Sequence, residues 1–197
     1  MLEEIFSIAL PLFLLMDSIG NIPIYIAVLK NCEPTRKKWI ILRELIIALG
    51  IILLFCFGGN YLLELLNVQH YTVMISGGII LFILALRMIF PTGFEDGSYV
   101  KGSDPLIVPL AVPLIAGPAV LAAVLLYSHS NNQLIVVAGI LLAWIASTII
   151  LMGSSFLQKL LKDRGITALE RLMGLILTLI AVQMFLQGFT LYKESLP

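Results

Sequence analysis

Six long runs of apolar residues dominate this chain, and each is long enough to cross the hydrocarbon core of a bilayer. A membrane-spanning helix needs about 20 consecutive apolar residues, whereas a spanning strand needs about half as many. The runs lack the alternation of apolar and polar residues that a lipid-facing barrel strand requires. We therefore expect an all-α, polytopic membrane protein with six transmembrane helices, at about 5–29, 39–66, 72–90, 106–128, 134–157 and 168–190.

The overall composition agrees with burial in lipid, because 60% of the 197 residues are hydrophobic and only 12% are charged. A soluble domain carries about 25% charged residues. The only two cysteines, Cys32 and Cys56, are not spaced like the ligands of a metal ion. The net charge is zero, so the chain as a whole has no positive electrostatic potential that would attract nucleic acid. We expect one transmembrane domain over 1–197 whose first partner is the lipid bilayer, with no enzymatic activity, metal or cofactor and no nucleic acid partner.

Basic residues lie on one side of the predicted spans and indicate how the chain is oriented. The loops at 30–38, 91–105 and 158–167, with the span ends beside them, hold eleven of the twelve Lys and Arg residues. Short loops rich in Lys and Arg stay in the cytoplasm. The other two loops hold no basic residue, and Lys193 is the exception. Both termini are therefore predicted to lie outside the cytoplasm.

The segments 78–88 and 174–184 resemble each other, with the same Gly, Ile, Leu, Ala and Met at five positions that are 96 residues apart. Apolar composition alone also produces some such matches. The offset is close to half of the chain, however, and it maps the third span onto the sixth. Three spans in each half make the second half cross the membrane in the opposite direction. The pattern predicts two inverted repeats, repeat A at about 1–92 and repeat B at about 104–197, as many secondary transporters have.

The first and fourth spans contain residues that a regular helix does not favour in its interior. Gly, Asn and Pro follow one another in the middle of the first span, and proline also lacks a backbone donor. Three prolines and a glycine lie within ten residues, 109–118, at the corresponding place in the fourth span. Interrupted helices at corresponding positions of two halves point to a transporter site. The predicted substrate-binding residues are Asp17, Gly20, Asn21, Pro23, Pro113, Gly117 and Pro118.

Asp17 is the only acidic residue near the centre of a predicted span, where an ionised carboxylate costs about 2.5–3.5 kcal/mol on insertion scales. We expect it to bind a coupling proton, a coupling cation or the ammonium group of a substrate. Backbone amides freed near Asn21 and Gly117 would bind a carboxylate. Two alternatives stay open at this point. The Pro and Gly residues only kink the helices, or Asp17 caps a half-helix.

Five charged residues near the predicted cytoplasmic ends of the spans are the gate candidates. Arg43 and Glu44 are adjacent at the start of the second span, Glu170 and Arg171 are adjacent in the sixth, and Arg87 lies near the end of the third. Arginine side chains can reach the interface simply by extending along the helix. The alternative is a latch between the halves, because the two glutamates lie deep enough to need partners.

Two further groups of residues are expected to contact other helices. Gly139, Ala143 and Ser147 recur every four residues on the fifth span and predict a close packing face. Gln183 and Gln187 in the sixth span either face a cavity or bond to a neighbouring helix.

Several of these segments resemble the MarC family of bacterial inner-membrane proteins. Ser18 departs from the family pattern, which usually has proline there, and this predicts a less sharply kinked first break. The matching motifs run through nearly the whole chain in the family's order: MDxxGNxP at 16–23, REL at 43–45, SGGI at 76–79, PLAxPLxxGP at 109–118 and LERLMG at 169–174.

The resemblance implies a six-span protein of the bacterial inner membrane that transports small neutral amino acids such as glycine and alanine. The family is also similar to the LysE-like exporters. We therefore expect a secondary transporter or exporter of small neutral solutes that works by alternating access. A channel of the same architecture, and a membrane assembly or regulatory subunit without transport, are the alternatives.

Overall fold

The computed structural model describes residues 1–22, 25–26, 33–90 and 115–196. These residues form helices and short connections, and no strand occurs among them, which confirms the predicted all-α class. The helices are α1 (Leu2–Met16), α3 (Pro34–Leu65), α4 (His70–Ile89), α5 (Pro118–Ser130), α6 (Gln133–Met152) and α7 (Ser154–Glu194).

Four helices in the described ranges are long and apolar enough to cross a membrane. They are Arg36–Leu65 within α3, the whole of α4 and α6, and Gly165–Glu194 within α7. These coincide with the predicted second, third, fifth and sixth spans. The described helices of the first and fourth predicted spans, α1 and α5, are shorter, at 15 and 13 residues. The chain is therefore a polytopic membrane protein in which two spans differ from the other four.

Two predicted polar loops are partly or wholly helical in the structure. α3 begins at Pro34, inside the predicted loop at 30–38, because proline suits the first turn of a helix and the basic residues after it are good helix formers. α7 begins at Ser154 and passes through the predicted loop at 158–167, with a kink at Lys162 (φ 53°, ψ 177°). The fifth span is correspondingly shorter than predicted. The interruption of helical geometry at Lys162 nevertheless lies inside the predicted polar loop at 158–167.

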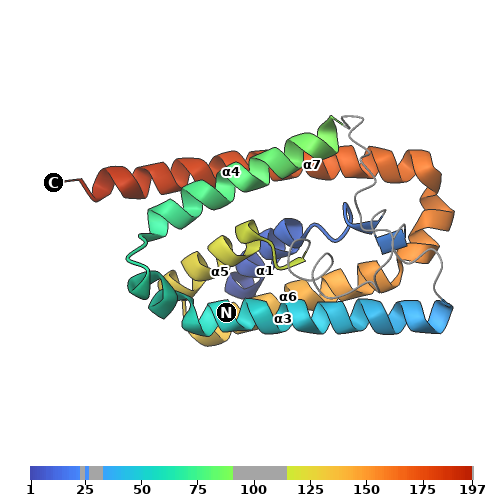
Figure 1. Ribbon diagram of the computed structural model, residues 1–197, viewed down its shortest axis with the longest axis horizontal. Helices are drawn as coiled ribbons and strands as arrows, with labels where there is room; N and C mark the ends of the chain where they lie inside the picture. The colour runs from blue at the N-terminus through green and yellow to red at the C-terminus, as the bar shows by residue number, and fades with distance from the viewer. Residues whose placement is uncertain (23–24, 27–32, 91–114, 197) are drawn as a thin grey trace.

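The helices are arranged so that the continuous spans enclose the interrupted ones. α4 and α7 lie side by side and run antiparallel along the long axis of the molecule, and α3 and α6 lie along the opposite side (Figure 1). α1 and α5 lie between these two pairs. Irregular backbone within a bilayer is tolerated only where protein or a cavity surrounds it, and this arrangement provides that surrounding.

The contact between α4 and α7 depends on a glycine from each helix. A Cβ atom added to Gly78 would lie 2.9 Å from the carbonyl oxygen of Ala181, and one added to Gly174 would lie 3.0 Å from the carbonyl oxygen of Ala85. The two contacts are reciprocal, because Gly78 and Gly174 are 96 positions apart in the sequence and so are Ala85 and Ala181. Halves related by a two-fold axis produce such reciprocity. The division into repeats A and B itself stays a prediction.

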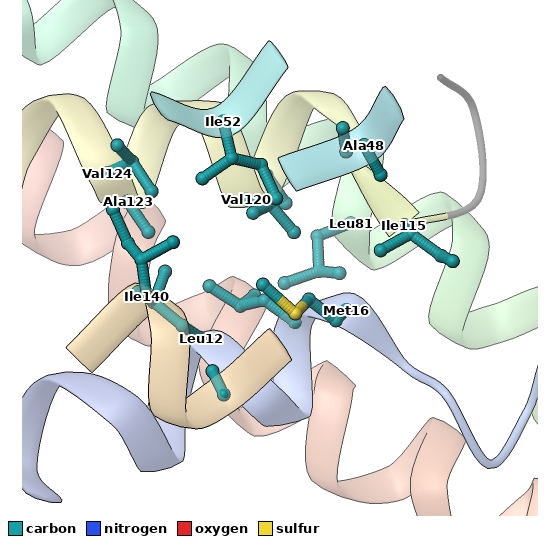
Figure 2. Packing of buried hydrophobic residues seen from close by; sticks show 14 of the residues in the cluster. Leu12, Met16, Ala48, Ile52, Leu81, Ile115, Val120, Ala123, Val124 and Ile140 are labelled. Carbon is teal, nitrogen blue, oxygen red and sulfur yellow. The ribbon is translucent and has the colours of Figure 1, made fainter. Parts of the chain in front are cut away.

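α1 packs on the small-residue face of α6, as the sequence pattern predicts. Gly139, Ala143 and Ser147 are all buried. The backbone of α6 at Gly139 lies close to Ile8, and the hydroxyl of Ser147 donates to the sulfur of Met16 at 3.4 Å. Side chains from all six described helices form the hydrophobic core. Figure 2 shows part of it, including Leu12, Ile52, Leu81, Val120, Val124 and Ile140.

We expect Gly78→Ala to destabilise the protein, because the new methyl group would meet the carbonyl oxygen of Ala181 and force α4 away from α7. Overpacking of this kind costs about 1–3 kcal/mol. Gly50→Ala in α3 is the matched control, since no atom lies within 4 Å of a Cβ added there. It should be neutral or stabilising by less than about 1 kcal/mol. Thermal unfolding in detergent measures both, and equal melting temperatures would contradict the close packing.

Candidate functional site

The first predicted break is present, and side chains satisfy its backbone groups. α1 ends at Asp17, which adopts the left-handed conformation (φ 44°, ψ 46°) that Asp and Asn tolerate better than most residues. The N–H of Gly20 donates to Asp17 Oδ1 at 3.2 Å, and Asn21 Nδ2 donates to the carbonyl oxygen of Met16 at 3.2 Å. Asp17 and Asn21 are each only 5% exposed. One oxygen of Asp17 therefore has a capping role.

Gly20 allows helix α4 to approach this break. A Cβ atom at Gly20 would clash with the carboxylate of Asp17 and with the terminal methyl group of Met88. A side chain at this position would therefore displace either the capping carboxylate or α4. Pro23, the last predicted residue of the break, lies outside the described residues.

The second predicted break coincides with the start of α5. Gly117 is the N-cap in an extended conformation (φ −67°, ψ 165°), and Pro118 is the first helical residue. The N-cap residue is a glycine and therefore has no side chain of its own to cap this helix start. The N–H groups of a first helical turn have no partner within the helix, and they form the positive end of the helix dipole. Pro113, the remaining predicted site residue, lies outside the described residues.

A cavity of about 290 Å³ lies where the two interrupted spans meet. Leu15 at the end of α1 lines it, with Gly117 and Pro118 at the start of α5. Arg87, near the end of α4, is the one charged residue among the described residues that line the cavity, and the others are apolar. The structure thus brings one predicted gate residue to the second break. The sequence could not show this proximity, because it depends on how α4 crosses α5.

The other four gate candidates occupy different surroundings. Arg43 donates to Oε1 of Glu44 from Nε at 3.0 Å and from Nη2 at 2.6 Å, so this pair lies within one helix and does not join the two halves. Glu170 is half-buried on α7, and its carboxylate is close enough to Asp17 to interact electrostatically. Arg171 is exposed. The proximity of Glu170 to the first break has no sequence signal, since it arises from the packing of α7 beside α1.

A second cavity of about 490 Å³ lies between α4, α5 and α7, and Gln183 and Gln187 line it. This agrees with the cavity-facing alternative for the two glutamines. The two cavities share no lining residue. Met74 lines the second and Arg87 the first, and these residues are thirteen positions apart on α4. At 1.5 Å per residue this is a separation of about 20 Å along the helix.

These features define a class of protein, a multi-pass α-helical membrane protein in which two interrupted spans meet at a cavity inside a shell of continuous helices. The sequence profile of the MarC family of integral membrane proteins matches residues 2–192, and the chain belongs to this family. No solved structure matches the chain.

Similar proteins cover almost the whole chain. The inner membrane protein YhgN of Escherichia coli (strain K12) is 48% identical over 197 residues, which are 98% of this chain and all of that protein. A membrane protein of the UPF0056 group from Buchnera aphidicola subsp. Baizongia pistaciae is 46% identical, over 95% of this chain and 96% of its own. A member from Chlamydia pneumoniae is 34% identical, over 94% of this chain and 93% of its own.

We expect Asp17→Asn to leave the first break intact, because asparagine tolerates the left-handed conformation and keeps an oxygen that can accept the Gly20 N–H. Asp17→Ala removes that acceptor and should lower the free energy of unfolding by about 1–3 kcal/mol, the usual result of leaving a buried donor unpaired. Thermal unfolding of both variants in one detergent distinguishes them. If Asp17→Ala were as stable as Asp17→Asn, the capping role would be wrong.

Proposed function

We propose that this protein is a secondary transporter or exporter of small neutral solutes, amino acids being the expected class, and that it works by alternating access. The cavity of about 290 Å³ at the junction of the two interrupted spans carries the proposal. Transporter sites recur at such junctions of broken helices. The volume lies at the lower end of the range for ligand pockets, about 300–1,000 Å³, which favours a small solute.

The charges around the two breaks suit an amino acid zwitterion. The uncapped start of α5 and the guanidinium of Arg87 are both favourable for a carboxylate group. The carboxylate of Asp17, two residues beyond Leu15 of the cavity lining, is the nearest described acidic group along the chain and would attract the ammonium group. The two groups of opposite charge thus select a solute that is neutral overall.

Alternating access needs two cavities that a closed contact separates. Between the two cavities, Gly77 of α4 lies against Ala122 of α5 and Met184 of α7. A Cβ atom added to Gly77 would lie 2.9 Å from the methyl carbon of Ala122. Gly77 follows Met74 of the larger cavity and precedes Ile80 of the smaller one. In our proposal, transport requires these three helices to separate at this contact while the other side closes.

The relatives and the charge pattern support a location and an orientation for this chain. The Escherichia coli relative is described as an inner membrane protein. We propose the bacterial inner membrane for this chain as well, with both termini outside the cytoplasm as the basic loops predict.

Uptake of labelled glycine or alanine into proteoliposomes tests the transport proposal. We expect a saturable flux with counterflow. Arg87→Gln should raise the solute concentration for half-maximal flux by about 10- to 100-fold, because a charge-assisted hydrogen bond contributes about 1.5–3 kcal/mol. Asp17→Asn should likewise reduce the flux. Lys193→Gln, which changes an exposed residue at the end of α7, is the control and should match the unmodified protein.

Three results would contradict the proposal in different ways. A flux without saturation or counterflow would indicate a channel. No flux, together with one stoichiometric partner that co-purifies, would indicate an assembly or regulatory subunit. A saturable flux that persists unchanged in Asp17→Asn would remove Asp17 from the site.

A further inference from the structure

Glu44 is a fully buried carboxylate that is only half satisfied. Its side chain is 0% exposed in the interior of α3. Oε1 accepts both hydrogen bonds from Arg43, whereas Oε2 is buried and has no hydrogen-bond partner among the described residues. Leaving a buried polar group unpaired costs about 1–3 kcal/mol, and more for a charged group. An ionisable residue within a membrane span that keeps such an atom is a functional candidate.

A second unsatisfied group faces the same region. The hydroxyl of Tyr25, which follows the first break, is buried and has no hydrogen-bond partner in the described part of the chain. The phenol is close enough to Glu44 for the two to interact electrostatically. Asp17, at the end of α1, interacts electrostatically with Glu170. Glu44 Oε2 and the Tyr25 hydroxyl are therefore two buried polar groups without hydrogen-bond partners among the described residues, and neither belongs to the capping interaction of Asp17.

Few other charges surround Glu44. α5 and α6 are the helices that pack most closely on α3. α6 carries no ionisable side chain, and those of α5 are Tyr127 and His129, near its far end. Arg43 is thus the one cation that an ionised Glu44 contacts among the described residues, and its side chain is 33% exposed. Because water and lipid headgroups reach that guanidinium, the arginine can remain charged after its carboxylate partner is neutralised.

We propose that Oε2 of Glu44 is the binding site of the coupling proton. The site rests on the proposed transport function, and it is distinct from the solute cavity, whose lining does not include Glu44. A proton taken up at Oε2 converts the carboxylate to a neutral carboxyl group and adds an O–H donor. The ion pair with Arg43 is then lost, and the guanidinium turns to the interface. Release of the proton restores the ion pair. The position of the Arg43 guanidinium therefore depends on whether the proton is bound to Glu44.

The structure supplies an optical probe of this change. The guanidinium carbon of Arg43 lies 5.4 Å from the centroid of the Trp39 ring, and Trp39 is 62% exposed. The sequence has only one other tryptophan, Trp144, whose Nε1 donates to the carbonyl oxygen of Leu45 at 2.7 Å. In a Trp144→Phe background, Trp39 is the single fluorescent tryptophan.

The experiment is a pH titration of the purified protein in detergent, with no solute present, followed by Trp39 fluorescence in the Trp144→Phe background. We expect a single sigmoidal change as the pH falls. Glu44→Gln, which imitates the protonated side chain, should abolish the change and show the low-pH spectrum at every pH. Glu64→Gln, an exposed glutamate on the same helix, is the matched control and should titrate like its parent.

Infrared difference spectroscopy of the otherwise unmodified protein gives a second measurement that does not depend on the tryptophan substitution. We expect a carboxyl C=O band that titrates with pH and is absent in Glu44→Gln. A band and a fluorescence change that both persist in Glu44→Gln would overturn the assignment, as would a fluorescence change that requires Na⁺ at constant pH. Because no solute is added, these results stand apart from the outcome of the transport assay.

Discussion

The N–H of Gly20 and the carbonyl oxygen of Met16 lie at the end of α1, in the middle of a membrane span, and they find their partners in the side chains of Asp17 and Asn21. Lipid offers no hydrogen-bonding groups, so a helix can stop inside a bilayer only where the protein itself supplies them. This requirement explains why α1 and α5 lie between the continuous helices. It also explains why a residue as costly as an aspartate occupies the centre of a span.

The continuous helices must come close together to enclose the breaks, and glycines make this possible. Gly78 and Gly174 bring α4 against α7, and Gly77 brings α4 against α5 and α7. Without a hydrophobic force between helices in lipid, such close backbone contacts are a main source of helix association. The contact at Gly77 separates the two cavities. The contact that brings these helices together is therefore also the one that our proposed transport cycle would have to open.

The three acidic residues discussed above have different surroundings, which separates their roles. Asp17 caps the first break, Glu170 approaches it from α7, and Glu44 is paired with Arg43 but keeps one unsatisfied oxygen. Arg87 is the cation that lines the smaller cavity. In the proposed transporter, Asp17 and Arg87 would bind the two charged groups of a zwitterion, and Glu44 would bind the proton apart from them. Membership of the MarC family is consistent with this assignment.

The amino-acid sequence by itself determined the fold class and the four continuous spans, because length and hydropathy act locally. The properties of proline and glycine also indicated the end of α1 at Asp17 and the start of α5 at Gly117 and Pro118. The helix of the second span begins inside the predicted loop at 30–38, and the predicted loop at 158–167 is reduced to the kink at Lys162. Only the tertiary structure decided that Arg87 lines the cavity and that Glu170 and Tyr25 lie near enough to Asp17 and Glu44, respectively, to interact electrostatically. These pairs join residues distant in the chain, and their proximity depends on how the helices cross, which local sequence properties do not specify.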